Sequence, residues 1–288
     1  MLIVTGANGH LGRAVVEHLL ELVPAERLGV SVQDTEKARD LEQRGVRVRR
    51  GDFDDAASLA HAFEGASRVL VVSVDKLGEE GVAQSKAAIE AAYRAGADRV
   101  LYTSHQAANR ASSFAPARDH AAVEAYLEAC GQPFTSLRNG YYTSSLAFHI
   151  GNAAQTGELA APADGPVSWT TRANLAEAAA AILVGDNPFD GPTPPLPAAR
   201  AVDMQEVAEI LSEVTGRTVR RVVVEDDDFI AHLTGRGIPA PFARLFIGTY
   251  QAARDGEFAV TDLALGRLIG RPPTPVRDAL RAEITPAR

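Results

Sequence analysis

The first twelve residues constrain the fold more than any other stretch. Residues 2–4 form an apolar run, and glycines then recur at every third position, at Gly6, Gly9 and Gly12. Apolar residues return with helical spacing over residues 11–22. A strand, a glycine turn and a helix in this order predict a Rossmann-type site for a dinucleotide pyrophosphate, although such turns also arise for close packing alone. The candidate cofactor contacts in this stretch are Gly6, Asn8, Gly9, His10, Leu11 and Gly12.

Composition excludes several classes of protein. The chain has 288 residues, a formal net charge of −8 and no basic stripe, so nucleic acid is not an expected partner. One cysteine and seven scattered histidines predict neither a disulfide framework nor a metal site. No apolar run is long enough to cross a bilayer, and a basic leader is absent at the start. We therefore expect a cytoplasmic protein with no membrane partner.

Strand and helix patterns alternate through the first half of the chain. This alternation predicts an α/β protein with a doubly wound parallel sheet, in which ligands bind beyond the carboxyl ends of the strands. Ser73-Val74 and Ser104-His105 each follow a predicted strand, so these four residues should meet the glycine turn in one crevice. The predicted strands are 28–32, 46–50, 69–72, 99–104 and 134–138, and the predicted helices are 58–63, 79–95 and 119–129.

Residues after the second and third predicted strands are candidates for contacting the adenosine part of the cofactor. Asp34 could accept a hydrogen bond from a free 2′-hydroxyl, which favours NAD, whereas Lys37 could bind a 2′-phosphate, which favours NADP. Asp34 could equally do no more than cap the next helix. Gln33 precedes it, and Asp52 and Phe53 could lie at the adenine edge or simply form a turn.

The pattern changes after residue 142. Residues 143–170 are small, polar and turn-rich, and residues 188–197 read as a proline-rich connector. A helix at 204–214 and a strand at 219–224 predict a smaller α+β substrate domain. We therefore predict two domains, 1–142 and 143–288, with the helix at 171–185 packed back on the first.

The proton-transfer pair of many enzymes with this architecture is missing. No tyrosine is followed four residues later by lysine, and the hydrolase pattern G-x-S-x-G is also absent. His120 and Glu124 instead lie one helical turn apart on one face, where His120 could steer the nicotinamide ribose or relay a proton. The alternative is an exposed surface pair. His105 is a second candidate for binding or proton transfer.

Four segments together resemble a known family. Residues 5–12, 51–55, 120–124 and 137–142 are similar to the NmrA-like atypical short-chain dehydrogenase/reductases, and the likeness extends over nearly the whole length. Within this family the chain looks most similar to the type 2 NAD(P)H:quinone oxidoreductases, with triphenylmethane reductases nearby. The resemblance implies a nucleotide-binding domain, a smaller C-terminal domain and hydride transfer from NADP(H) or NAD(H). In some members it implies nucleotide sensing without turnover.

The resemblance also implies roles for single residues. The segment at 137–142 resembles the stretch that lines the nicotinamide and substrate crevice, so Asn139, Gly140 and Tyr142 are candidate cofactor contacts. Tyr141 joins His120 as a candidate catalytic residue. Two departures stand out. Related benzylic ether reductases carry lysine at the place of His120, and the family often has arginine where this chain has a neutral amide after the second strand.

Because the tyrosine–lysine pair is missing, the sequence favours an acceptor whose reduction needs little acid catalysis. A quinone or another conjugated aromatic acceptor becomes a stabilised phenolate on reduction, whereas a plain ketone needs an acid worth about 10²–10⁴-fold in rate. We therefore predict an NAD(P)H-dependent reductase of a small quinone-like or conjugated aromatic molecule. The alternatives are a non-catalytic dinucleotide sensor that binds a protein partner and a tailoring reductase of an aromatic natural product. A homodimer is possible.

Overall fold

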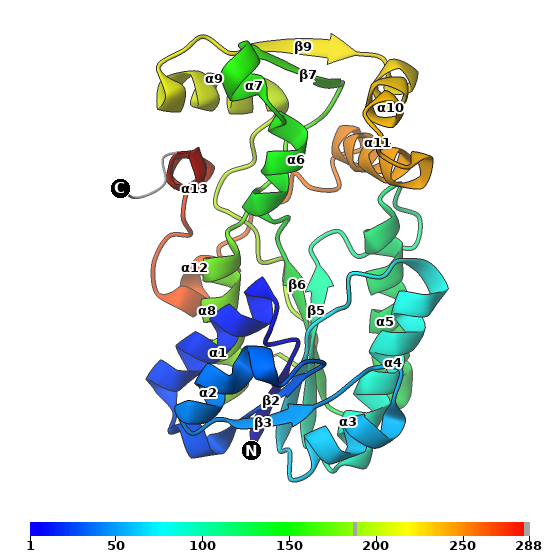
Figure 1. Cartoon of the computed structure of the whole chain (residues 1–288), viewed down its shortest axis with the longest axis vertical. Coiled ribbons are helices and arrows are strands. Elements are labelled where there is room, and N and C mark those ends of the chain that lie inside the picture. Colours follow the sequence, from blue (N-terminus) through cyan, green and yellow to red (C-terminus); the bar gives the residue numbers. More distant parts are fainter. Residues whose placement is uncertain (187–188, 285–288) are drawn as a thin grey trace.

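A computed structural model describes residues 1–186 and 189–284 and shows a central parallel sheet (Figure 1). Its seven strands lie in the order β3-β2-β1-β4-β5-β6-β8, and every neighbouring pair is parallel. This order confirms the predicted Rossmann-type sheet, with its switch point between β1 and β4. The strands are β1 Leu2–Thr5, β2 Leu28–Val32, β3 Arg47–Arg50, β4 Arg68–Val71, β5 Arg99–His105, β6 Phe134–Asn139 and β8 Gly191–Pro192.

Helices cover both faces of the sheet. On one face α1, α2, α8 and α12 enclose an apolar core with β1 and β2, and on the other α3, α4 and α5 enclose a second core with β4 and β5. Figure 1 shows these two helical layers on opposite sides of the strands. The helices are α1 His10–Leu22, α2 Arg39–Gln43, α3 Ala56–Phe63, α4 Gly78–Arg94, α5 Ala115–Cys130, α8 Arg172–Val184 and α12 Ala264–Ile269.

A second, smaller layer lies beyond the carboxyl ends of the strands (Figure 1). It has its own apolar core around Trp169 and a two-stranded parallel sheet of β7 and β9. Its helix α9 begins at a capping box between Asp203 and Glu206. The elements are η3 Thr143–Ser145, α6 Leu146–Ile150, α7 Ala153–Thr156, β7 Glu158–Pro162, α9 Met204–Thr215, β9 Arg220–Val224, α10 Asp226–Gly235, α11 Ala240–Arg254 and α13 Val276–Ile284.

Four sequence-based expectations need correction. The stretch 143–170 is not irregular, because it contains η3, α6, α7 and β7. The connector at 188–197, whose first residue lies outside the described part, contains β8, which adds a strand at the edge of β6. Helix α5 starts four residues early, because Pro116 is tolerated in a first helical turn. His105 belongs to β5 rather than following it.

The division at residue 142 remains a prediction. Helix α8 packs against α1 within one apolar core, and β8 joins the main sheet, so two elements from the second half of the chain complete the first layer. Short η1 Ala25–Arg27 and η2 Glu36–Ala38 complete the connections on either side of β2. In the described part of the chain, no helix has the length and apolar character needed to span a membrane.

Candidate active site

Two adjoining pockets form one cleft at the switch point of the sheet. The first has a volume of about 580 Å³ and the second about 650 Å³. The carboxyl ends of β1 and β4 lie between them, and ligands of open α/β sheets bind at such a place. The pockets share Gly6, Gly9, Val72, Ser73, Val74 and Asp75.

The glycine turn forms a tight backbone cradle between the two pockets. Gly6 has a φ of +64°, which other residues rarely adopt, and its N–H donates to the carbonyl of Ser31. The N–H of Gly9 donates to the carbonyl oxygen of Gly6 at 2.9 Å. A Cβ at Gly12 would lie only 2.5 Å from that same oxygen, so helix and turn can approach only with glycine there.

The amino end of α1 is open to the cleft. Gly9 is its N-cap and provides no side-chain cap, and the first helical N–H groups have no partner within the helix. His10, Leu11 and Gly12 line the second pocket at this point. Unpaired N–H groups and the helix dipole suit a diphosphate, so this cradle fits the pyrophosphate of a dinucleotide.

The first pocket ends at the residues predicted for the adenosine ribose. Gln33, Asp34 and Lys37 line it, and Phe53 lies on the same wall. The Asp34 carboxylate accepts the N–H of Glu36 at 3.1 Å and lies 3.6 Å from the Lys37 ammonium. Asp34 therefore lines the pocket and also supports the turn into η2, and its contact with the adenosine ribose stays a prediction.

Two of the predicted contacts do not line either pocket. The Asp52 carboxylate accepts hydrogen bonds from the Arg50 guanidinium at 3.2 Å and from the Asp54 N–H at 3.1 Å, which is the turn role. Asn139 is buried at the end of β6, and its backbone carbonyl accepts the N–H of Gln106.

Aromatic rings form the wall of the second pocket. The His105 ring lies 5.5 Å from those of Phe114 and Tyr141, measured between centroids. Tyr141 is buried, its hydroxyl lies 3.5 Å from that of Thr249, and burial raises its pKa to about 12. A flat, apolar ligand would therefore meet ring faces and edges on this side of the cleft.

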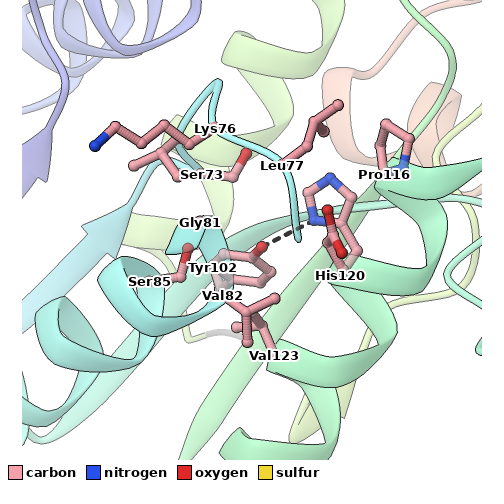
Figure 2. Close-up of a pocket in the computed structure, with 12 residues that line it drawn as sticks. Ser73, Lys76, Leu77, Gly81, Val82, Ser85, Tyr102, Pro116, His120 and Val123 are labelled. Carbon is pink, nitrogen blue, oxygen red and sulfur yellow. Dashed lines mark hydrogen bonds between the residues drawn. The ribbon is translucent and has the colours of Figure 1, made fainter. Parts of the chain in front are cut away.

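His120 lines the same pocket beside His105 and is half-buried. Its Nδ1 is 2.9 Å from the hydroxyl of Tyr102, and Figure 2 shows the other ring nitrogen on the side away from Tyr102. Burial lowers the pKa of His120 to about 4, an effect that the charge of Glu124 partly offsets. The imidazole is therefore neutral at pH 7.

His105 stacks 6.2 Å from His120, with an angle of 15° between the rings. Its Nδ1 accepts the N–H of Ala107 at 3.2 Å, so the ring proton lies on Nε2. That Nε2 is buried and has no partner in the described part of the structure. Burial lowers the pKa of His105 to about 3, so this ring is also neutral.

Glu124 makes structural hydrogen bonds to residues of β5 and β6. It is 4% exposed and accepts hydrogen bonds from Ser104 Oγ at 2.8 Å and Ser136 Oγ at 2.9 Å. Arg138 Nη2 donates to its second oxygen at 2.7 Å. The alternative of an exposed surface pair is therefore wrong, because Glu124 ties α5 to β5 and β6 and so fixes the helix that carries His120.

Sequence reasoning missed Arg172, the first residue of α8. Its guanidinium lies 4.6 Å from the centre of the Tyr142 ring and donates to Ser144. No local pattern marks it, because only the packing of α8 onto the sheet brings it to the cleft. Three other missed residues, Asp75, Lys76 and Leu77, directly follow Ser73-Val74, so a longer candidate segment at this place would have included them. The missed lining residues are Ser31, Val32, Gly51, Asp54, Val72, Asp75, Lys76, Leu77, Gln84, Phe114, Pro116, Ser145 and Arg172.

The structure brings the other predicted residues together. Eighteen of the twenty candidates line the cleft, and Asp52 and Asn139 are the two that do not. In the parts of the chain that the structure covers, no cluster of side chains could hold a metal ion. Those that line it are Gly6, Asn8, Gly9, His10, Leu11, Gly12, Gln33, Asp34, Lys37, Phe53, Ser73, Val74, Ser104, His105, His120, Gly140, Tyr141 and Tyr142.

Fold and cleft define a Rossmann-type dinucleotide-binding protein. Within that class the chain belongs to the NmrA-like family, whose model matches residues 1–263. This confirms the family that the motifs indicated.

Three characterised relatives are similar over nearly their whole lengths. Quinone oxidoreductase 2 of Escherichia coli is 31% identical over 281 residues, with 97% of each chain covered. Its crystal structure, an NADPH-dependent quinone oxidoreductase complexed with NADPH, has a TM-score of 0.93 at 29% identity over 99% of this chain and 100% of that one. The triphenylmethane reductase of Citrobacter sp., complexed with NADP(H), has a TM-score of 0.90 at 33% identity over 98% and 99% of the two chains. The NAD(P)H azoreductase of Xenophilus azovorans is 28% identical, with 94% of each chain covered.

Proposed function

We propose that this protein is an NAD(P)H-dependent oxidoreductase that transfers hydride to a small quinone-like or conjugated aromatic acceptor. One observation carries the proposal: the glycine cradle opens directly into a pocket walled by His105, Phe114 and Tyr141. The relatives support it, because their names include a quinone oxidoreductase, an azoreductase and a triphenylmethane reductase. All three act on conjugated aromatic or quinonoid molecules by name.

The residues of the chain have separable tasks in this reaction. The amino end of α1 holds the pyrophosphate, and the bound nicotinamide supplies the hydride. The aromatic wall orients a flat acceptor and keeps water away, so the barrier falls largely through positioning. His120, stacked beside His105, donates a proton to the reduced oxygen or nitrogen. The missing tyrosine–lysine pair is consistent with an acceptor whose reduced form is already a stabilised anion.

Finer assignments belong to the proposal as well. The cofactor contacts are sixteen of the eighteen predicted residues that line the cleft, all except His120 and Tyr141, with Arg172 added beside Tyr142. Tyr141 acts as part of the wall rather than as an acid, because a pKa of about 12 makes its hydroxyl a weak proton donor. The partner is a small molecule, and assembly into a homodimer is a further proposal that gel filtration would test.

Loss of reduced-nicotinamide absorbance with a panel of quinones tests the function directly. Gly9→Asp places a carboxylate where the pyrophosphate would lie, and a Cβ there already lies 3.3 Å from the carbonyl oxygen of Gly6. We expect this variant to lose cofactor binding and turnover together. Gly235→Asp is the matched control, because Gly235 is exposed with open space around it.

A different result would identify the alternative function. Tight cofactor binding by the unaltered chain, without oxidation by any acceptor in the panel, would contradict the enzyme and favour the dinucleotide sensor.

A further inference from the structure

A small pocket adjoins the large cleft at His120, and Ser73, Val74, Leu77 and Pro116 also line both. The volume of the small pocket is about 40 Å³, which is room for a water molecule or a few, and Figure 2 shows it between α4, α5 and the loop after β4. Tyr102, His120 and Ser85 contribute polar groups to it. Exposed Lys76 and Leu77 also line it, so the pocket reaches the surface through this loop.

The hydrogen bonds around Tyr102 have a direction. Burial raises the pKa of Tyr102, and the nearby Ser85 side chain offsets this only in part, so the phenol stays protonated. A protonated phenol has a hydrogen to give, and Nδ1 of His120 lies 2.9 Å from the Tyr102 oxygen, so the path argued below has Tyr102 as the donor and Nδ1 as the acceptor. This arrangement places the ring proton of His120 on Nε2, at the edge turned away from Tyr102 (Figure 2).

A neutral imidazole is a poor acid by itself. If His120 gave its Nε2 proton to a product and received nothing, it would become an imidazolate, which is far too unstable at neutral pH. The loss is feasible only when Nδ1 gains a proton in the same step. The group on Nδ1 is the hydroxyl of Tyr102, and the small pocket beside that hydroxyl reaches the surface at Lys76 and Leu77.

We propose that Tyr102 and the small pocket beside it form a proton path that reprotonates His120 at Nδ1 while an acceptor is reduced. The inference rests on the proposed reductase function and extends it. Tyr102 is a positioning residue in this account, because it acts through His120 and does not line the large cleft.

The proton balance closes without a further reactant. His120 breaks its Nε2–H bond and the proton bonds to the anionic atom of the reduced acceptor. The Tyr102 proton moves to Nδ1, and a water in the small pocket replaces it, either directly or through Ser85. One proton from solvent is consumed for each hydride that the cofactor delivers, and His120 returns to its starting form after its ring protons exchange with solvent.

Imidazole ¹⁵N spectroscopy of the full chain without cofactor tests the path independently of activity. We expect the resonances of His120 to show the tautomer protonated on Nε2. In Tyr102→Phe, which keeps the ring and removes the hydroxyl, this preference should be lost. Tyr126→Phe is the matched control on α5 and should leave the pattern unchanged, because Tyr126 does not line this pocket. His120 protonated on Nδ1 in the unaltered chain would overturn the proposal.

Two acceptors with different proton needs test the same path in turnover. A quinone takes a hydride and a proton, whereas a cationic triarylmethane dye becomes neutral on taking a hydride and needs no proton. Tyr102→Phe should lower kcat for the quinone about ten-fold or more, raise its solvent deuterium isotope effect and leave KM for the cofactor in place. The ratio of quinone to dye rates should therefore fall by a similar factor.

The outcomes separate the two claims. Equal losses with quinone and dye would assign Tyr102 a purely structural role and overturn the path. If the unaltered chain oxidises the cofactor with neither acceptor, the reductase function fails, and the tautomer of His120 still decides whether the relay geometry exists. Should Tyr102→Phe not fold, Ser85→Ala provides the second variant, with a smaller loss for the quinone alone.

Discussion

Charge is nearly balanced at the adenosine end of the cleft. Lys37 lies 3.6 Å from the Asp34 carboxylate, and Lys76 contacts Glu80 and lies 3.8 Å from Asp54. Among the described residues that line this pocket, none is an arginine. A 2′-phosphate therefore meets cations that already have carboxylate neighbours, and the two cofactors should differ little in affinity.

Replacing Gln33 should change this balance. Gln33→Arg adds a planar cation that can bind a phosphate through two hydrogen bonds, so NADPH affinity should rise about ten-fold relative to NADH. Titration calorimetry with both cofactors measures the ratio. Gln43→Arg, on an exposed turn of α2, makes the same chemical change away from the cleft and should leave the ratio alone. An unchanged ratio in Gln33→Arg would remove Gln33 from the ribose site.

His149 couples stability to pH. It is 7% exposed, its Nδ1 lies 2.9 Å from the Tyr250 hydroxyl, and burial lowers its pKa from 6.5 to about 4. Because the folded pKa lies below the unfolded one, the unfolded chain binds the extra proton between these values. The contribution of His149 is therefore complete above about pH 6.5 and declines as the pH falls to about 4, by about 3 kcal/mol.

Urea unfolding at a series of pH values measures this coupling. His149→Asn should give a shallower fall in the free energy of unfolding over that window, even if the variant is less stable throughout. His232→Asn, on an exposed face of α10, should keep the original slope. A parallel curve for His149→Asn would show that its proton affinity does not change on folding.

At the scale of elements, α5 is held to the sheet by one buried carboxylate. Glu124 receives the hydroxyls of Ser104 and Ser136 and the guanidinium of Arg138, so it connects the helix to two strands. Removing one partner from a buried charged pair leaves the other charge uncompensated, which is costly. The same contact fixes the height of His120 along the wall of the cleft, because the two residues share a helix.

Glu124→Ala should lower the free energy of unfolding by about 3–5 kcal/mol. Glu124→Gln keeps the shape and part of the hydrogen bonding, so its loss should be smaller. Glu128→Ala, one turn further on and exposed, should change stability by less than about 0.5 kcal/mol. Denaturant midpoints of the three variants check this order, and equal losses for Glu124→Ala and Glu128→Ala would contradict it.

At the scale of the whole molecule, a ligand in the cleft touches strand ends, α1 and α8 together. Buried hydrogen bonds also join the layers, since Gln106 and Ser168 both donate to the carbonyl of Phe258. A ligand that binds only the folded chain stabilises all of it. A cofactor at a hundred times its Kd should therefore raise the free energy of unfolding by about 2.7 kcal/mol.

Thermal unfolding with and without NADPH or NADH measures the effect. Gly9→Asp should abolish the shift, and Gly235→Asp should retain it. No shift and no heat of binding at saturating cofactor would exclude a dinucleotide from the cleft.

The residues found from sequence share a local signal. The glycine turn, Gln33-Asp34 and Ser73-Val74 each follow directly after an apolar strand, and parallel strands end at one edge of a sheet. The glycine turn can be predicted from the sequence because Gly12 must lack a Cβ for the helix to approach the carbonyl of Gly6. The strands that were missed have a weak strand pattern, because β8 has only two residues and β7 is made largely of alanine and ends in proline.

What the sequence alone determined is the doubly wound parallel sheet, the glycine turn after its first strand and most of the cleft floor, because these follow from local periodicity and from where strands end. Tertiary structure alone decided the rest. Phe114, Arg172 and the pocket beside Tyr102 reach the site through packing between segments far apart in the chain, and no spacing in one segment reports such contacts. The direction of Glu124, into the sheet and not toward solvent, depends on Arg138 in the same way.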